Sequence, residues 1–372
     1  MKIINARVLD PDGIFRERDI YIDGERFCES DAGGETIDAR GFYALPGLID
    51  IHFHGADGFD FCDGTPEALR AISEYEASVG VTAICPATVT QPEETLIKAC
   101  ANARELKDSL EGAALVGINL EGPFINKSKK GAQNPDYILN PDLEMFKRLQ
   151  QASSGLIKLC DLAPELDGAM EFIEAISDDV AVSLAHTAAG YDTAYEAFES
   201  GACHLTHLYN AMPPLHHREP GVIGAGADFG CEAELIADGV HVHPGAVRAA
   251  YRLFGAENII LISDSMRAVG LPDGDYTLGG LAVKVCGSRA TLEDGTIAGS
   301  NTPLLGCLQT AVREMDIPLE TAAMSATANP ARSIGIYEER GSIEPGKTAD
   351  LILLDDGTLD LARVILRGRV FA

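Results

Sequence analysis

Apolar segments and amphipathic segments alternate along the chain from about residue 46 to residue 263. The apolar segments are short and rich in β-branched residues, which is typical of buried strands, and the segments between them have apolar residues at helical spacing. We expect strands near 47–54, 81–85, 113–120, 156–161, 179–185, 203–206, 233–238 and 258–263. We expect helices that include 66–79, 92–109, 142–152, 168–176, 191–200 and 244–254.

Eight buried strands that alternate with helices favour an α/β fold, a parallel (β/α)8 barrel of the TIM type. An open, doubly wound sheet is the main alternative. Neither GxGxxG nor GxxxxGK[ST] follows any of the expected strands, so the phosphate-binding signatures that often accompany an open sheet are missing. The barrel is therefore the predicted architecture.

Both ends of the chain have a different pattern, in which short strands are separated by tight turns. Near the start, KIINARVLD and FRERDIYID flank the turn Pro11-Asp12-Gly13, and the tail, ADLILLD and ARVILRGRVF, again has the composition of strands. We predict a small β-sandwich domain formed by residues 1–45 and 336–372, beside a barrel formed by residues 46–335.

The alternation breaks after the eighth expected strand. Residues 271–298 contain short strand-like pieces and glycine turns, which predict a β insertion in the barrel. Helical segments follow at 302–315 and 318–327, and Asn329-Pro330 is expected to end the second of them.

Composition and charge restrict the class of protein. The formal net charge of −28 over 372 residues opposes nucleic acid or an anionic membrane as a partner. The nine cysteines never form CxxC and mostly have apolar neighbours, so we expect reduced core thiols in a cytoplasmic protein. The start, MKIINARVLDPDG, lacks the pattern of a signal peptide, and no segment has the apolar length of a membrane span.

The segment PGLIDIHFHGADG, residues 46–58, contains the first candidate chemistry. In an extended strand, Asp50, His52 and His54 would point to one face, while Ile51 and Phe53 would point to the other. Two imidazoles on one face can hold a cation. An isolated His-x-His is more often a packed or hydrogen-bonded pair, so further ligands are needed to decide.

Further polar residues stand at the ends of the expected strands. These are Glu121 after the third strand, His186 after the fifth, His207 after the sixth and Asp264 after the eighth. The carboxyl ends of barrel strands form one face, so these residues would converge with His52 and His54. Buried ionisable groups cost several kcal/mol unless they are paired or bind a metal, so the cluster predicts a metal site.

Several motifs carry a resemblance to a known family. They are PGLIDIHFHG, LEGPFIN followed by KKGAQNP, LAHT, HLYNAM with REPG, IADGVHVHP, SDSM, NPAR and GSIEPGKTADLILLD. The chain resembles the amidohydrolase superfamily of metal-dependent barrels and, within it, the N-acetylglucosamine-6-phosphate deacetylases. The resemblance runs from residue 46 to residue 355. It implies hydrolysis of N-acetylglucosamine 6-phosphate to glucosamine 6-phosphate and acetate, in amino-sugar catabolism or cell-wall recycling.

The resemblance also implies roles for single residues. Glu121, His186 and His207 would hold the main divalent ion, His52 and His54 would form a second metal position, and Asp264 would be the catalytic general base and acid. The implied phosphate contacts are Asn210, Ala211, Arg218 and His241, some of them from a neighbouring subunit of a homodimer. One or two ions per chain are expected, and the ligands do not distinguish zinc, iron, manganese and cobalt.

Gln133 departs from the family pattern, which commonly has a histidine at this position. The position is expected to approach the carbonyl or the hydroxyl groups of the substrate, and a glutamine can donate a hydrogen bond but carries no titratable proton. A deacetylase of another N-acetylated amino sugar or of an N-acyl amino acid therefore stays open as an alternative. A catalytically silent barrel is a third possibility, which the six competent groups of the site oppose.

Overall fold

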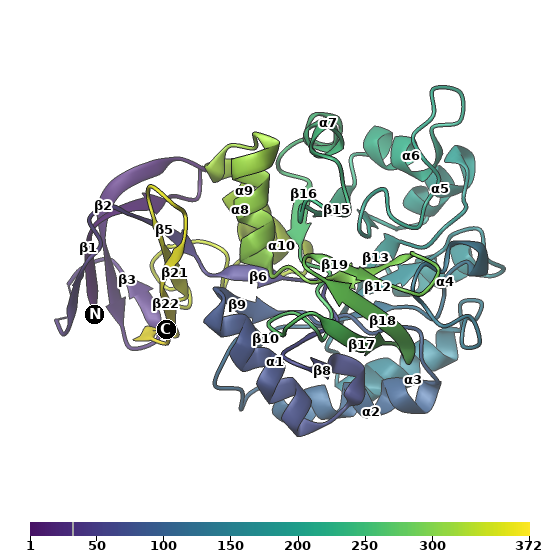
Figure 1. Cartoon of the computed structure of the whole chain (residues 1–372), viewed down its shortest axis with the longest axis horizontal. Helices are drawn as coiled ribbons and strands as arrows, with labels where there is room; N and C mark the ends of the chain where they lie inside the picture. The colour runs from purple at the N-terminus through teal and green to yellow at the C-terminus, as the bar shows by residue number, and fades with distance from the viewer. Residues whose placement is uncertain (32) are drawn as a thin grey trace.

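The computed structural model of the chain describes residues 1–31 and 33–372. It has two parts: a sheet on the left of Figure 1, which contains both chain ends, and a larger α/β body on the right. Among the residues that the structure describes, no helix combines the length and the apolar character needed to cross a bilayer.

The α/β body is a (β/α)8 barrel, as predicted. Its parallel strands form two arcs, β10-β9-β6 and β11-β12-β13-β14-β15-β16. The arcs join where Ala87 pairs with Asn119, and where the amide of Asp264 donates to the carbonyl of His52 at 3.0 Å. The third strand of the barrel is split into two pieces, β10 and β11, so the eight strands carry nine labels. They are β6 (Leu48–Asp50), β9 (Val81–Ile84), β10 (Ala114–Leu115), β11 (Ile118–Glu121), β12 (Ile157–Leu162), β13 (Ala181–Leu184), β14 (His204–Leu205), β15 (Glu232–Ile236) and β16 (Ile259–Ile262).

Helices follow the strands and cover the barrel. Local capping fixes where several of them begin: the Thr65 hydroxyl accepts from the amide of Ala68, and Asp142 accepts from the first turn of α3. The helices are α1 (Pro66–Ser78), α2 (Glu93–Leu106), α3 (Leu143–Ser153), α4 (Ala169–Ile176), α5 (Tyr191–Glu199), α6 (Gly221–Phe229), α7 (Pro244–Phe254), α8 (Leu304–Met315), α9 (Leu319–Ser325) and α10 (Ala328–Ser333), with short 3-10 helices η1 (Phe61–Asp63) and η2 (Lys127–Lys129).

The strands of both chain ends belong to one eight-stranded sheet. The order is β23-β22-β21-β5-β1-β2-β3, and β4 pairs with β1. Its strands are β1 (Lys2–Leu9), β2 (Phe15–Asp23), β3 (Arg26–Cys28), β4 (Thr36–Asp38), β5 (Phe42–Pro46), β21 (Leu351–Asp355), β22 (Leu361–Leu366) and β23 (Arg369–Val370). Because β5 leads directly into β6, this sheet is anchored at the start of the first barrel strand.

The expected insertion is a four-stranded antiparallel sheet in the order β17-β18-β19-β20. Its strands are β17 (Gly274–Leu278), β18 (Leu281–Cys286), β19 (Arg289–Thr291) and β20 (Ile297–Ser300), and a small hairpin, β7 (Gly55–Ala56) with β8 (Phe59–Asp60), follows the first barrel strand. Ser300 pairs with Ser265 in an isolated bridge, so the end of the insertion lies against the segment that follows β16.

Two local expectations were wrong. The first barrel strand ends at Asp50, so the alternation of faces does not continue: Ile51 packs with Ile49 in the barrel interior, whereas Phe53 packs in the outer core. Pro330 does not end a helix but lies in the first turn of α10. A proline is tolerated there because the amide that it lacks would have no helical partner.

Glu76 of α1 is a buried carboxyl group outside the barrel mouth. Only 1% of its surface is exposed, and neither of its oxygens has a hydrogen-bond partner among the residues that the structure describes. Burial, together with the nearby carboxyl group of Asp50, raises the pKa of Glu76 well above its usual range. The folded protein therefore binds a proton more tightly at Glu76 than the unfolded chain does.

This shift predicts the pH dependence of stability. Between the unfolded and folded pKa of Glu76 the folded state holds more protons, so the free energy of unfolding falls as pH rises from about 4.5. In Glu76→Gln the free energy of unfolding no longer falls with pH for this reason, because glutamine does not titrate. Relative to the wild type, the variant therefore gains stability as the pH rises from 5 to 8, because only the wild type must keep the proton of Glu76 or bury its charge.

Urea unfolding at both pH values measures this gain. Glu74→Gln, at an exposed position of the same helix, is the matched control. An equal pH dependence in the wild type and in Glu76→Gln would contradict the raised pKa.

Candidate active site

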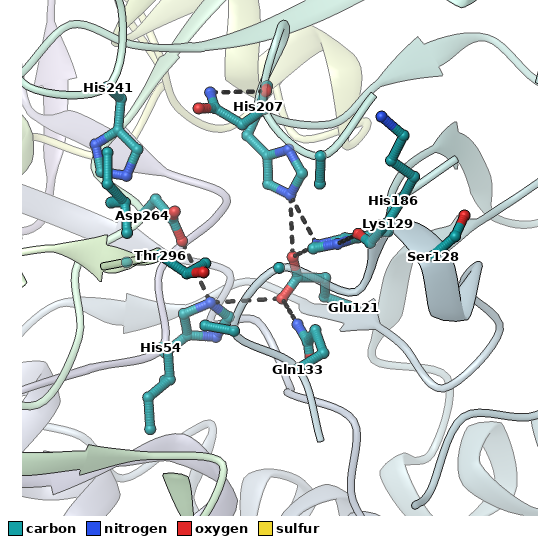
Figure 2. Close-up of a pocket in the computed structure, with 17 residues that line it drawn as sticks. His54, Glu121, Ser128, Lys129, Gln133, His186, His207, His241, Asp264 and Thr296 are labelled. Carbon is teal, nitrogen blue, oxygen red and sulfur yellow. Dashed lines mark hydrogen bonds and ion pairs between the residues drawn. The ribbon is translucent and has the colours of Figure 1, made fainter. Parts of the chain in front are cut away.

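Six buried ionisable side chains meet at the carboxyl end of the barrel strands. Figure 2 shows Glu121 in the middle of the group, with His54 on one side and with His186 and His207 on the other. The structure thus brings together all the candidate metal ligands and the candidate catalytic acid. His52 and His54 follow β6, Glu121 ends β11, His186 follows β13, His207 follows β14, and Asp264 follows β16.

The backbone turns sharply at three of these positions. His186, His207 and Asp264 have φ values of 43°, 31° and 49°. Each residue lies two positions after the last residue of its strand. A non-glycine residue in a sparsely populated conformation of this kind costs about 1–3 kcal/mol, and such residues cluster at functional sites. The turn brings each side chain from the strand end toward the shared centre.

Glu121, His186 and His207 form a tight triangle of possible ligand atoms. Oε1 of Glu121 lies 3.0 Å from Nε2 of His186 and 3.2 Å from Nε2 of His207, and the two nitrogens are 3.1 Å apart. Ligands at about 2.0–2.1 Å from a tetrahedral zinc ion would stand about 3.3 Å from one another. The spacing of the triangle therefore fits one divalent ion.

The end of η2 and the residues that follow it set the orientation of His186. Nδ1 of this ring lies 2.8 Å from the carbonyl oxygen of Lys129, which can only accept, so Nδ1 carries the hydrogen and Nε2 of a neutral ring offers a lone pair. Gly131 has a φ of 54°, and a Cβ atom there would lie 3.3 Å from the ring. A side chain at this position would strain the backbone and crowd the ring, so glycine favours the close approach to His186.

His52 and His54 form a second group that shares Glu121. Nε2 of His54 lies 3.4 Å from Oε2 of Glu121 and 3.2 Å from Oδ1 of Asp264. Nε2 of His52 lies 3.6 Å and 3.8 Å from the same two carboxylates, and has no hydrogen-bond partner within the described part of the chain. A buried nitrogen aimed at two carboxylates suits a second cation.

Both carboxylates of the site are held in the ionised form. Burial acts to raise the pKa of Glu121, but its contacts with His186 and His207 hold that pKa well below its usual range. Burial likewise acts to raise the pKa of Asp264, and the hydrogen bond with His54 lowers it below its usual range. Glu121 is therefore available as a ligand, and Asp264 is available to accept a proton.

Gln133 lies in the site, but its amide is engaged at both ends. Nε2 donates to Oε2 of Glu121 at 2.7 Å, as Figure 2 shows, and Oε1 accepts from the amide of Thr90 at 2.6 Å. The sequence led us to expect that Gln133 approaches the substrate. It does line the cavity, and in addition its amide nitrogen orients Glu121.

A cavity of about 380 Å³ opens onto the group. Gln133, Asn210, Ala211 and His241 line it, as the sequence-based assignment of substrate contacts requires. Arg218 does not line this cavity; it is exposed, and its Nη1 lies 2.7 Å from Nε2 of His217. Four of the five expected substrate contacts are thus gathered in one chain.

His241 is held in place by an acidic partner. Its Nδ1 lies 2.7 Å from Oδ2 of Asp238, which also accepts from the hydroxyl of Ser300 at 3.2 Å. Burial acts to lower the pKa of His241, but Asp238 raises it above its usual range. The ring can therefore present a positive charge to an anionic group in the cavity.

Sequence reasoning missed several residues of the site. Glu234 on β15 contacts His52, and its only signal was a charged residue within the apolar segment EAELIA. The insertion supplies further cavity wall, from Leu278, Thr296 and Ile297. Their sequence carries no sign of the site, because only the folding of the insertion back over the barrel mouth places them there.

Comparisons with known proteins agree with the geometry. The Amidohydrolase family profile matches residues 43–370. The N-acetylglucosamine-6-phosphate deacetylase of Bacillus subtilis (strain 168) is 42% identical over 332 residues, which are 88% of this chain and 84% of that protein. The N-acetylgalactosamine-6-phosphate deacetylase of Escherichia coli O157:H7 is 36% identical, over 87% of this chain and 86% of that protein.

A solved structure is similar over its whole length. It is a variant of the N-acetyl-D-glucosamine-6-phosphate deacetylase of Mycobacterium smegmatis in complex with N-acetyl-D-glucosamine 6-phosphate. The TM-score is 0.92 at 30% identity, and the match covers 100% of this chain and 99% of that one. The profile match, these similarities and the ligand groups at the barrel mouth show that this chain belongs to the amidohydrolase family.

Proposed function

We propose that this chain hydrolyses the amide bond of N-acetylglucosamine 6-phosphate, giving glucosamine 6-phosphate and acetate. One observation carries the proposal: two metal-ligand groups and an ionised aspartate open onto a single cavity. Proteins that are similar over most of their length and bear this activity in their names support the choice of substrate.

The residues present fit a divalent metal cofactor. In the proposal, Glu121, His186 and His207 hold one ion, and His52 and His54 form the second position beside the same Glu121. A bound divalent ion lowers the pKa of a water molecule toward 7 and polarises the amide carbonyl. The oxygen and nitrogen ligands suit zinc, iron, manganese or cobalt alike.

Asp264 moves the proton. Its carboxylate lines the cavity and is ionised, so it can accept a proton from the attacking water. It can return that proton to the amine nitrogen as the carbon–nitrogen bond breaks. One water molecule is consumed, its oxygen joins the acetyl carbon, and its protons are shared between the products.

The sugar phosphate is bound in the proposal by cavity residues other than the ligand groups. In the proposal, the backbone amides of Asn210 and Ala211 and the ring of His241 bind the phosphate. The amide of Asn210 donates to the carbonyl of His207 at 3.0 Å in this structure, so it would exchange that bond for one to the phosphate. Local donors of this kind can hold an anion in spite of the net charge of −28, because hydrogen bonds to a charged oxygen act at short range.

Arg218 completes the phosphate site across a homodimer in this proposal. It is exposed and lies outside the cavity of its own chain, so a contact with substrate requires a neighbouring copy. A guanidinium group binds phosphate through paired hydrogen bonds, which makes this residue type well suited to the role.

A second substrate is supported by one comparison, the similarity to a deacetylase of N-acetylgalactosamine 6-phosphate. The two sugars differ only in the configuration of one hydroxyl group, and the ligand groups would serve both equally. The ratio of kcat/KM for the two phosphosugars decides between them.

Asp264→Asn should remove the proton carrier while leaving the metal ligands in place. We expect kcat for N-acetylglucosamine 6-phosphate to fall about 10²- to 10⁴-fold, with a much smaller change in KM. Acetate release measures the rate, and the exposed Asp275→Asn is the control. Turnover near the wild-type value in Asp264→Asn would remove this residue from the mechanism.

The double variant His52→Gln, His54→Asn tests the number of ions. We expect one ion fewer per chain than in the wild type, with part of the activity retained, because Glu121, His186 and His207 are untouched. Elemental analysis measures the ions alongside turnover. Loss of all metal in the double variant would show that the two positions are not separable.

Arg218→Ala and Asp264→Asn test the homodimer together. Each variant alone should be nearly inactive, and dimers mixed from both should regain about a quarter of the wild-type activity, because half of them contain one complete site. Arg218 acting within its own chain would give no recovery. Light scattering of the unmixed proteins provides the oligomeric state.

A further inference from the structure

Glu234 lies beneath both ligand groups. It is the third residue of β15, and none of its surface is exposed. Its Oε2 lies 2.8 Å from Nδ1 of His52 and 3.1 Å from the backbone nitrogen of His207. His52 belongs to one group and His207 to the other, so a single carboxylate oxygen contacts both.

A buried carboxylate in an apolar strand is unfavourable unless hydrogen bonds or nearby charges compensate for its loss of water. Removing such a charge from water costs several kcal/mol. The second oxygen of Glu234, Oε1, has no hydrogen-bond partner within residues 1–31 and 33–372. The carboxylate is therefore stabilised mainly by its contacts with His52 and His207. Both of these residues belong to the ligand groups of the metal site.

The contact with His52 decides which ring nitrogen is free. A carboxylate can only accept, so Nδ1 of His52 carries a hydrogen, and in the neutral ring that a metal ligand requires Nε2 keeps its lone pair. That lone pair is directed toward Glu121 and Asp264. The other polar neighbour of Nδ1, the side-chain nitrogen of Asn119 at 3.4 Å, is a donor and cannot take this role.

The contact with His207 acts on the backbone. His207 has a φ of 31°, a conformation that a non-glycine residue adopts only when its surroundings hold it. The hydrogen bond from its amide to Glu234 holds that turn, and the turn places Nε2 of His207 3.2 Å from Oε1 of Glu121.

We infer that Glu234 is a positioning residue for both metal positions, which fixes the tautomer of His52 through its side chain and the orientation of His207 through its backbone. The inference rests on the metal site of the proposed function and deepens it. Partners of metal ligands of this kind typically change metal affinity about 10- to 100-fold when they are removed.

Zinc release provides the test without any substrate. The zinc-loaded full-length protein is mixed with a chromogenic chelator, and the release of each ion is followed over time. We expect Glu234→Ala to release the ion of the His52 and His54 group about 10- to 100-fold faster than the wild type. Glu234→Gln should lie between the two, because its amide oxygen still accepts from Nδ1 but carries no charge.

Glu232→Ala, two residues earlier on the same strand, is the matched control and should release zinc at the wild-type rate. Combining Glu234→Ala with His52→Gln separates the two contacts. If Glu234 acts on the His52 and His54 group through His52, Glu234→Ala no longer accelerates zinc release from that group once His52→Gln is present. The ion of the Glu121, His186 and His207 group is still released faster, because Glu234 acts on His207 separately. Circular dichroism of the metal-free variants shows whether they are folded.

Release at the wild-type rate in both Glu234→Ala and Glu234→Gln would overturn the inference, as would equal acceleration in the Glu232→Ala control. If Glu234→Ala does not fold, Glu234→Gln decides alone: faster release supports the inference, and unchanged release overturns it. Failure to deacetylate the phosphosugar, with zinc release still dependent on Glu234, would instead refute the proposed substrate.

Discussion

The carboxylate of Glu121 is the interaction on which the site depends, because it is shared. Its two oxygens contact His186 and His207 on one side and His54 on the other. Several lone pairs and negative charges therefore meet among side chains that are almost completely buried. Burying such groups is costly unless they are paired or bind a cation, so the electrostatics around this one residue favour a metal ion between its neighbours.

The barrel supplies the geometry that this interaction needs. The strands end at one edge, and the chain turns two residues later at His52, His186, His207 and Asp264. A ring of parallel strands holds these turns at fixed separations, because each strand is hydrogen-bonded to its neighbours on both sides. The strained backbone at three of the four positions is tolerated because the sheet and the surrounding loops hold it.

Residues that hold the ligands come from other parts of the chain. Gln133 and the carbonyl of Lys129 lie on the loop after β11, and Glu234 lies within β15. These groups fix which oxygen or nitrogen of each ligand faces the centre. The ligands are therefore surrounded by a second layer of residues, and this second layer decides how the ligands are oriented.

The sequence by itself determined the barrel, its insertion and which histidines and carboxylates meet at the barrel mouth. Strand and helix periodicity is local, and a histidine or a carboxylate after an apolar segment can be recognised without knowing its neighbours. Tertiary structure alone decided that His52 lies beyond its strand, that Gln133 donates to Glu121, and that Glu234 serves two groups. Each of these three features depends on contacts between residues that are far apart in the sequence. Neither composition nor residue spacing indicates which polar atoms come into contact when the chain folds.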